Sequence, residues 1–136
     1  MAGETILVVD DEPVNLRLAA AVLRSDGYKV HLASSGEQAQ MTLNTMLPDL
    51  MLVDMQLPGI DGLELTRRVR SQLRTKNMLV VALTASTSPQ HESAAYEAGC
   101  DGFIPKPFEL SAVGDLVDEL LKRGRAGLTA LQSSQA

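Results

Sequence analysis

Short apolar runs recur along the chain, and most of them stop abruptly at a polar residue. Residues 6–9 and 50–53 are continuously apolar, and each run is followed by an aspartate. A run of this kind is typical of a strand that is buried on both faces of a parallel sheet. We therefore predict five strands, at residues 6–9, 28–33, 50–53, 78–83 and 102–104.

The segments between these strands have helical spacing and helical start signals. Proline at a first helical position, and Ser or Asp followed three residues later by Gln or Glu, both mark helix N-termini. Glycine just beyond an amphipathic stretch marks its end. The predicted helices begin near Pro13, Ser35, Asp61 and Ser88, the first and fourth end near Gly27 and Gly99, and a fifth covers 113–121.

Five strands that alternate with five helices through short loops predict one α/β domain with a doubly wound parallel sheet. The chain has 136 residues, which suits a single domain. We place this domain at residues 4–123. The remaining residues, 124–136, contain Gly, Ser and Gln, and we expect a mobile tail with one further turn around 126–131.

The composition argues against several classes of function. Acidic residues number 17 against 12 basic ones, for a net charge of −5, which disfavours direct nucleic-acid binding. The single cysteine, Cys100, excludes a disulfide framework and a multi-cysteine zinc site. No run of about 18 apolar residues and no signal-peptide pattern occurs, so we expect no membrane insertion and a cytoplasmic location.

The residues at the predicted strand ends have complementary chemistry: Asp10 and Asp11, Asp54, Thr84 and Lys106. The carboxyl ends of parallel strands meet at one edge of a sheet, which is where ligands bind. Three carboxylates that lie together repel one another, and oxygen ligands of this kind suit Mg²⁺, with Mn²⁺ as a substitute. A lysine and a hydroxyl beside them complete a set that handles phosphoryl groups.

The sequence lacks the motifs of nucleotide-binding enzymes and the residue groupings of common hydrolases. Neither a GxGxxG nor a GxxxxGK[ST] loop occurs. The two histidines, His31 and His91, fall on a predicted strand and a predicted helix away from the strand ends. A nucleotide-driven kinase or an ordinary hydrolase is therefore poorly supported, and a carboxylate that accepts a phosphoryl group fits better.

In its motifs the chain resembles the response-regulator receiver domains of two-component signalling and is similar to the chemotaxis-type regulators. The matching stretches are ILVVDDE at 6–12, DLMLVDMQLPGIDG at 49–62, VALTA at 81–85 and KPF at 106–108. The resemblance covers residues 4–123. It implies a flavodoxin-like receiver fold with five helices and strand order 2-1-3-4-5.

The resemblance also implies a role for each motif residue. Asp54 is the implied phosphoacceptor. The implied Mg²⁺ ligands are Asp10, Asp11, Asp54 and the main-chain carbonyl of Gln56. The implied phosphoryl ligands are Lys106, Thr84 and the main-chain N–H groups of Ala85 and Met55. Thr84 and Phe103 are the implied switch residues, Pro107 the implied site of a cis peptide, and Gln56 and Ser86 stand where the family tunes loss of the phosphoryl group.

Some residues allow simpler interpretations. Phe103 stands where the family usually has Tyr, and Pro105 is acceptable mainly on an edge strand. The basic residues between Arg67 and Lys76 most simply form a solvated helix face. The methionines are interpreted as gap-filling core residues.

The resemblance predicts a signalling module, not an enzyme that turns over external substrates. Its expected partners are a histidine kinase or histidine phosphotransfer protein and an unidentified protein target, in a monomer or a phosphorylation-dependent dimer. Two alternatives stay open. A haloacid-dehalogenase-type phosphatase would need an acid where Gln56 stands, and a receiver-like scaffold would not need the phosphoryl group. Within signalling, a single-domain regulator, a phosphorelay shuttle and a receiver of a hybrid kinase all fit.

Overall fold

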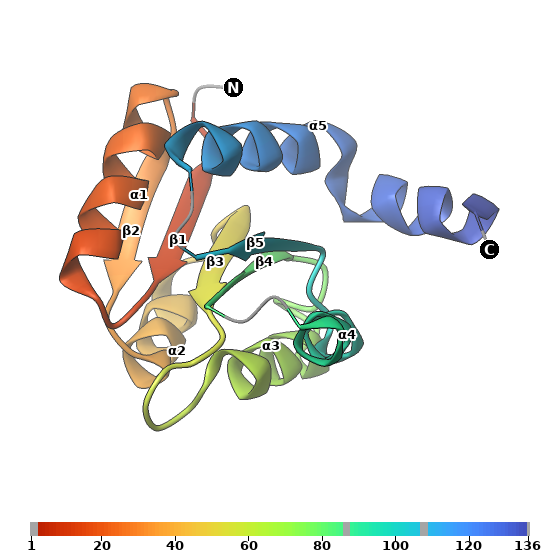
Figure 1. Ribbon diagram of the computed structural model, residues 1–136, viewed down its shortest axis with the longest axis horizontal. Helices are drawn as coiled ribbons and strands as arrows, with labels where there is room; N and C mark the ends of the chain where they lie inside the picture. The colour runs from red at the N-terminus through yellow and green to blue at the C-terminus, as the bar shows by residue number, and fades with distance from the viewer. Residues whose placement is uncertain (1–2, 86–87, 107–108, 136) are drawn as a thin grey trace.

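The computed structural model describes residues 3–85, 88–106 and 109–135, and its centre is one five-stranded sheet (Figure 1). Every strand pair is parallel, and the order is β2-β1-β3-β4-β5, as predicted. The order is that of a doubly wound sheet, in which strands are added first on one side of β1 and then on the other. The strands are β1 (Thr5–Val9), β2 (Lys29–Ala33), β3 (Leu50–Asp54), β4 (Leu79–Thr84) and β5 (Gly102–Pro105).

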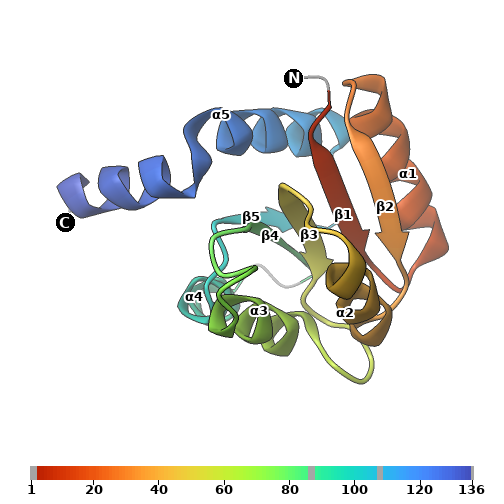
Figure 2. The same cartoon turned by 180° about the vertical axis from the view of Figure 1, so that it is seen from behind.

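Helices cover both faces of the sheet. The helices are α1 (Pro13–Ser25), α2 (Gly36–Thr45), α3 (Gly62–Ser71), α4 (Pro89–Ala98) and α5 (Leu110–Gln135). Figures 1 and 2 show α1 and α5 on one side of the sheet and α2, α3 and α4 on the other. The right-handed β-α-β crossovers of parallel strands place helices on both faces in this way.

The core is correspondingly divided into two apolar clusters. Alternate residues of the central strands face opposite sides, so Leu7 and Val9 join one cluster while Ile6 and Val8 join the other. The first cluster lies under α2, α3 and α4, and the second lies under α1 and α5. Both faces need apolar side chains, which explains why the central strands read as continuous apolar runs.

The predicted helix caps are present. Ser35, Asp61 and Ser88 each accept a hydrogen bond from the main-chain N–H three residues later. Gly99 ends α4 in the left-handed conformation, with φ of 115°. Pro105 ends β5, which is an edge strand, as its missing N–H requires.

Two apolar residues are exposed, and one of them contradicts an expectation. Leu32 lies on the edge strand β2 and is 38% exposed. Met41 is 70% exposed on α2 and fills no gap, although Met51, Met55 and Met78 are buried as predicted.

The C-terminal helix is longer than the sequence pattern indicates. It continues to Gln135 after a kink at Gly124, where φ is 69° and ψ is 165°. The turn expected around 126–131 is part of this extension, which points away from the sheet in Figure 1. Mobility of the tail stays a prediction. Within the described ranges, no helix has the length and apolar character to span a bilayer.

Candidate functional site

Asp54 is the last residue of β3, a strand whose five residues are all buried. Its side chain is only 7% exposed, at the carboxyl edge of the sheet. Oδ1 accepts a hydrogen bond of 2.9 Å from the main-chain N–H of Gln56, and Oδ2 lies 3.0 Å from Nζ of Lys106. A buried strand end thus holds a carboxylate in one orientation, with a donor on each oxygen.

Lys106 connects the ends of three strands. Its Nζ lies 2.8 Å from Oδ2 of Asp10, after β1, and 3.0 Å from Oδ2 of Asp54, at the end of β3. Its main-chain N–H donates to the carbonyl of Thr84, at the end of β4, over 2.7 Å. The lysine is therefore fixed by both its main chain and its ammonium group.

The protonation of Lys106 reflects two opposing effects. Burial by itself lowers the pKa of Lys106, but the hydrogen bonds and negative charges of Asp10 and Asp54 outweigh burial, so the pKa is raised above its usual value of 10.5. The ammonium form therefore persists at physiological pH. Its stabilising effect is present below the usual lysine pKa and is lost as the pH rises through the raised value.

Asp10 and Asp11 differ in their surroundings. Asp10 is fully buried and accepts hydrogen bonds from the main-chain N–H of Glu12 and the side-chain amide of Asn15. Asp11 is exposed. The sequence pattern did not identify Asn15, because an amide five residues after Asp10 has no distinctive spacing.

The three carboxylates fit a divalent cation. One oxygen each from Asp10, Asp11 and Asp54 lies within 4.8 Å of the others. These are hard oxygen donors with unequal exposure, an arrangement that suits Mg²⁺ with retained waters. Lys106 offsets one of the three negative charges, so the cluster keeps a negative balance that favours a cation.

One predicted phosphoryl donor is wrong. The main-chain N–H of Met55 donates to the carbonyl of Leu83 over 2.9 Å, because Asp54 pairs with Leu83 and the ladder between β3 and β4 continues one residue further. The N–H that reaches the Asp54 carboxylate belongs to Gln56. For the main chain of Gln56, the resemblance implied a role only for the carbonyl.

The remaining predicted residues are placed as follows. Thr84 is buried at the end of β4, and Ala85 follows it on the surface. Phe103 is half-buried and packs against the cluster under α2, α3 and α4. The predictions for Ser86, Pro107 and Phe108 lie outside the described residues.

The loop after Asp54 is held by close backbone packing. A Cβ on Gly62, the first residue of α3, would lie 2.4 Å from the carbonyl oxygen of Asp54 and 2.7 Å from Cα of Met55. Only glycine allows α3 to begin this close to the acceptor strand. At the far side of the loop, a Glu37 carboxylate oxygen accepts from the N–H of Ile60.

A hollow of about 190 Å³ adjoins the site. It lies between α3 and α4 and is lined by Met55, Gln56, Leu63, Thr84, His91 and Ala94. His91 therefore shares a hollow with residues at the strand ends, contrary to the expectation that both histidines lie away from them. Its imidazole Nδ1 lies 2.9 Å from Oγ of Ser88, the residue that caps α4.

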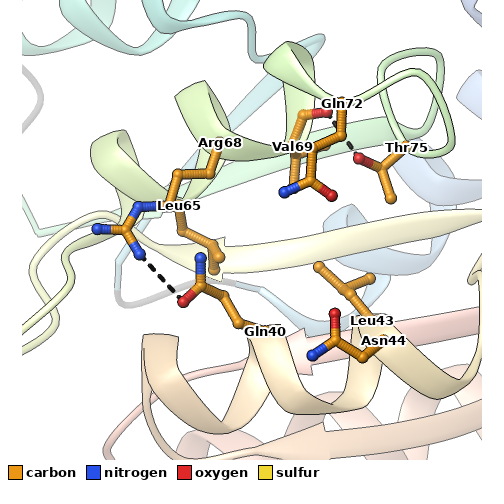
Figure 3. Close-up of a pocket in the computed structure, with 8 residues that line it drawn as sticks. All are labelled: Gln40, Leu43, Asn44, Leu65, Arg68, Val69, Gln72 and Thr75. Carbon is orange, nitrogen blue, oxygen red and sulfur yellow. Dashed lines mark hydrogen bonds between the residues drawn. The ribbon is translucent and has the colours of Figure 1, made fainter.

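A second hollow, of about 210 Å³, lies between α2 and α3 (Figure 3). Arg68 reaches across it to Gln40 and also pairs with Glu64. Its lining residues include no carboxylate, and its one charge is already paired. This hollow therefore lacks the clustered carboxylates that the strand ends provide.

The basic residues near this hollow are not simply a solvated face. Arg67 and Lys76 are exposed, as expected, but the side chain of Arg70 is only 14% exposed and pairs with Asp101. Arg74 donates to the carbonyl of Leu43. Arg74 is nevertheless exposed, so Arg70 is the arginine that departs from the expected solvated face.

The doubly wound sheet thus carries three acids, a threonine and a lysine at its carboxyl edge. The family model of the response regulator receiver domain matches residues 6–118, and the chain belongs to this family. Its curated relatives include proteins named as response regulators and one named as a hybrid signal transduction histidine kinase.

Three comparisons illustrate the relationship. The phosphate regulon transcriptional regulatory protein PhoB of Pseudomonas aeruginosa is 34% identical over 127 residues, covering 93% of this chain and 56% of PhoB. The receiver domain of the P. aeruginosa sensor histidine kinase PA1611, with magnesium coordinated in its active-site cleft, is 34% identical at a TM-score of 0.78, with 92% and 99% coverage. The chemotaxis response regulator CheY4 of Vibrio cholerae is 26% identical at a TM-score of 0.82, with 86% and 98% coverage.

The curated relatives and the solved structures differ in how much of their own length the chain covers. The chain spans about half the length of the curated relatives it matches, whereas it covers almost the whole of the solved receiver domains. The activities of the longer relatives are therefore not carried over to this chain.

Proposed function

We propose that Asp54 accepts a phosphoryl group from the phosphohistidine of a histidine kinase or histidine phosphotransfer protein. The observation that carries the proposal is the contact of Lys106 with both Asp10 and Asp54, at 2.8 and 3.0 Å, beside the carboxylate of Asp11. A lysine that contacts two buried carboxylates beside a third, at the ligand-binding edge of a sheet, is the kind of charge cluster that marks functional sites.

In the proposed step, a carboxylate oxygen of Asp54 attacks phosphorus, and the phosphorus–nitrogen bond to the donor histidine breaks. The electron pair returns to the imidazole nitrogen, which takes up a proton. Lys106 supplies positive charge beside the transferring oxygens, and the N–H of Gln56 lies on the other oxygen of Asp54. Thr84 and the N–H of Ala85 are the further proposed donors.

Asp10, Asp11, Asp54 and the carbonyl of Gln56 would hold Mg²⁺. When bound, the cation neutralises charge that develops on the phosphoryl oxygens. The burial of Asp10 and the exposure of Asp11 support direct binding by Asp11 and binding by Asp10 largely through water.

Phosphorylation is proposed to change the face formed by α4, β5 and α5. Thr84 moves toward the new charge and Phe103 moves inward, which shifts the population between two packings. The position of Phe103 at the edge of an apolar cluster supports this proposal, because a half-buried ring has both an inner and an outer environment.

The proposal is tested with acetyl phosphate, a small acyl-phosphate donor. With Mg²⁺, the intact mass of the wild-type protein should increase by one phosphoryl group, and chelation should prevent the increase. Asp54→Ala should show no increase. If that variant gains the group to the same extent, Asp54 is not the acceptor. Sustained hydrolysis of phosphate esters would instead favour the phosphatase alternative.

A further inference from the structure

Arg70 lies near the C-terminal end of α3. Among the described residues outside the acceptor site, its side chain makes the most extensive set of hydrogen bonds. Its Nε and Nη2 donate to the carbonyl of Gly99, over 2.9 and 2.7 Å. Nη2 also lies 2.8 Å from Oδ2 of Asp101. The guanidinium therefore contacts the residue that ends α4 and the residue that precedes β5.

The same side chain also contacts the beginning of β4. Nη1 donates to the carbonyls of Lys76 and Met78, over 2.9 and 2.6 Å. Asp101 completes the connection, because its Oδ2 accepts from the N–H of Val80 over 3.0 Å. One planar side chain with five donors thus joins α3, α4, β4 and β5, which a lysine could not do.

The packing of α4 is uneven along its length. Its two buried residues, Ala95 and Ala98, lie in its second half, next to the Arg70 contacts. The first turns, from Pro89 to Ser93, bury no side chain in the core. Local stability follows buried contacts, so the C-terminal half of α4 is the more firmly held.

The weakly held half of α4 lies over the hollow that adjoins the acceptor site. His91 and Ala94 of α4 line this hollow, and Gln56 and Thr84 line its other side. The volume of about 190 Å³ leaves room for the helix to approach. A movement of Thr84 therefore acts next to the half of α4 that buries no side chain in the core, and far from the end that Arg70 contacts.

We propose that Arg70 is a positioning residue that fixes the C-terminal end of α4, so that phosphorylation moves the N-terminal half into the hollow. We call the movement of the N-terminal half of α4 the lever, and the fixation of its C-terminal end by Arg70 the anchor. The lever rests on the proposed function, because phosphoryl binding at Asp54 provides the stimulus. The anchor does not depend on that function, because it follows from the contacts of Arg70 with Gly99 and Asp101.

Two NMR measurements on the full chain separate the anchor from the lever. The first is amide hydrogen exchange without any phosphoryl group. Arg70→Met should accelerate exchange at Gly99 and Cys100 by about tenfold or more, since their N–H groups are bonded within the held end of α4. Arg68→Met is the matched control on the same helix and should leave both rates unchanged. Equal rates in wild type and Arg70→Met would overturn the anchor.

The second measurement adds beryllofluoride and Mg²⁺, which imitate the phosphoryl group. In wild type, chemical-shift changes along α4 should be confined to its N-terminal half, whereas in Arg70→Met they should extend to Gly99 and Cys100. Changes of equal size at both ends of wild-type α4 would overturn the lever. Failure of wild type to bind beryllofluoride would reject the proposed function and the lever, while the exchange result still decides the anchor.

Asp101→Asn provides the test if Arg70→Met does not fold. This substitution weakens one contact of Arg70 and keeps its other contacts. Hydrogen exchange at Gly99 and Cys100 should therefore accelerate, and the chemical-shift changes should spread to these residues, both to a smaller extent than in Arg70→Met. Rescue by Arg70→Lys should be incomplete, because one ammonium group cannot contact Gly99, Met78 and Asp101 together. Full rescue would show that charge alone suffices and would contradict the positioning role.

Discussion

Lys106 determines the charge balance of the acceptor site. It is the one cation in the described structure that contacts both Asp10 and Asp54, and burial makes these contacts stronger than surface ion pairs. The identity of these three residues followed from their positions at strand ends. Their hydrogen bonds did not, since the roles of Asn15 and the Gln56 N–H depend on the local path of the backbone.

Replacement of Lys106 should therefore affect stability as well as function. Lys106→Met leaves two buried carboxylates without their cation and should lower the free energy of unfolding by about 2–4 kcal/mol at pH 7 without Mg²⁺. Urea denaturation measures the change. Lys122→Met, at an exposed position of α5, should stay within about 0.5 kcal/mol of wild type. An unchanged midpoint for Lys106→Met would show that the lysine contributes nothing to the folded state.

Cys100 gives a prediction about alkaline pH. Burial raises the pKa of the Cys100 thiol to about 11, from 9.0, and this effect outweighs the hydrogen bond with Thr66 and the charge of Arg70. A raised pKa means that the folded state keeps its proton longer than the unfolded state. The contribution is therefore present below pH 9 and is lost as the pH rises from 9 to 11.

The comparison of wild type with Cys100→Ala isolates this effect, because Tyr28 and Lys106 titrate in both proteins. Across this range, wild type should lose about 2 kcal/mol more stability than the variant. Chemical denaturation at a series of pH values measures the difference. Parallel curves for the two proteins would contradict the burial of the thiol.

At the scale of elements, the start of α3 fixes the geometry of the acceptor loop. The Asp61 cap and the helical spacing of α3 were readable from the sequence, because both depend on residues a few positions apart. The close approach of Gly62 to the carbonyl of Asp54 was not, because it depends on how α3 docks against β3. The anchoring role of Arg70 was missed for the same reason.

Two helical glycines form a matched pair. Gly62→Ala should destabilise the protein by about 1–3 kcal/mol, because its Cβ would meet backbone atoms of Asp54 and Met55. Gly114→Ala, in α5, should be neutral or stabilising by up to about 1 kcal/mol, since its Cβ would meet only the mobile carboxylate of Asp26. Thermal and urea unfolding measure both variants. Equal effects would show that glycine propensity alone, and not docking, governs these positions.

At the scale of the whole molecule, the sheet and its two covering layers were predictable because the hydrophobic pattern repeats at each strand and helix. Strand order was not contained in that pattern and came from the family resemblance. The exposure of Leu32 on the edge strand β2 and the length of the helix beyond Gly124 were not predicted. Periodicity identifies the elements, whereas their neighbours decide what each one buries.

The extension beyond Gly124 should be dispensable for folding. Every buried hydrophobic residue among the described side chains lies at or before Leu120. A chain that ends at Gly124 should therefore keep the free energy of unfolding within about 1 kcal/mol of the full chain. Urea denaturation of both chains checks this. A loss of several kcal/mol would show that the terminal helix packs on the domain.

Asp54, and neither Asp10 nor Asp11, should receive the phosphoryl group. Borohydride reduces an aspartyl phosphate to homoserine, so the acceptor is identified by peptide mass spectrometry after treatment with acetyl phosphate, Mg²⁺ and borohydride. We expect homoserine at position 54 and unchanged aspartates at positions 10 and 11. Homoserine at position 10 or 11, or at none of the three, would show that Asp54 is not the acceptor.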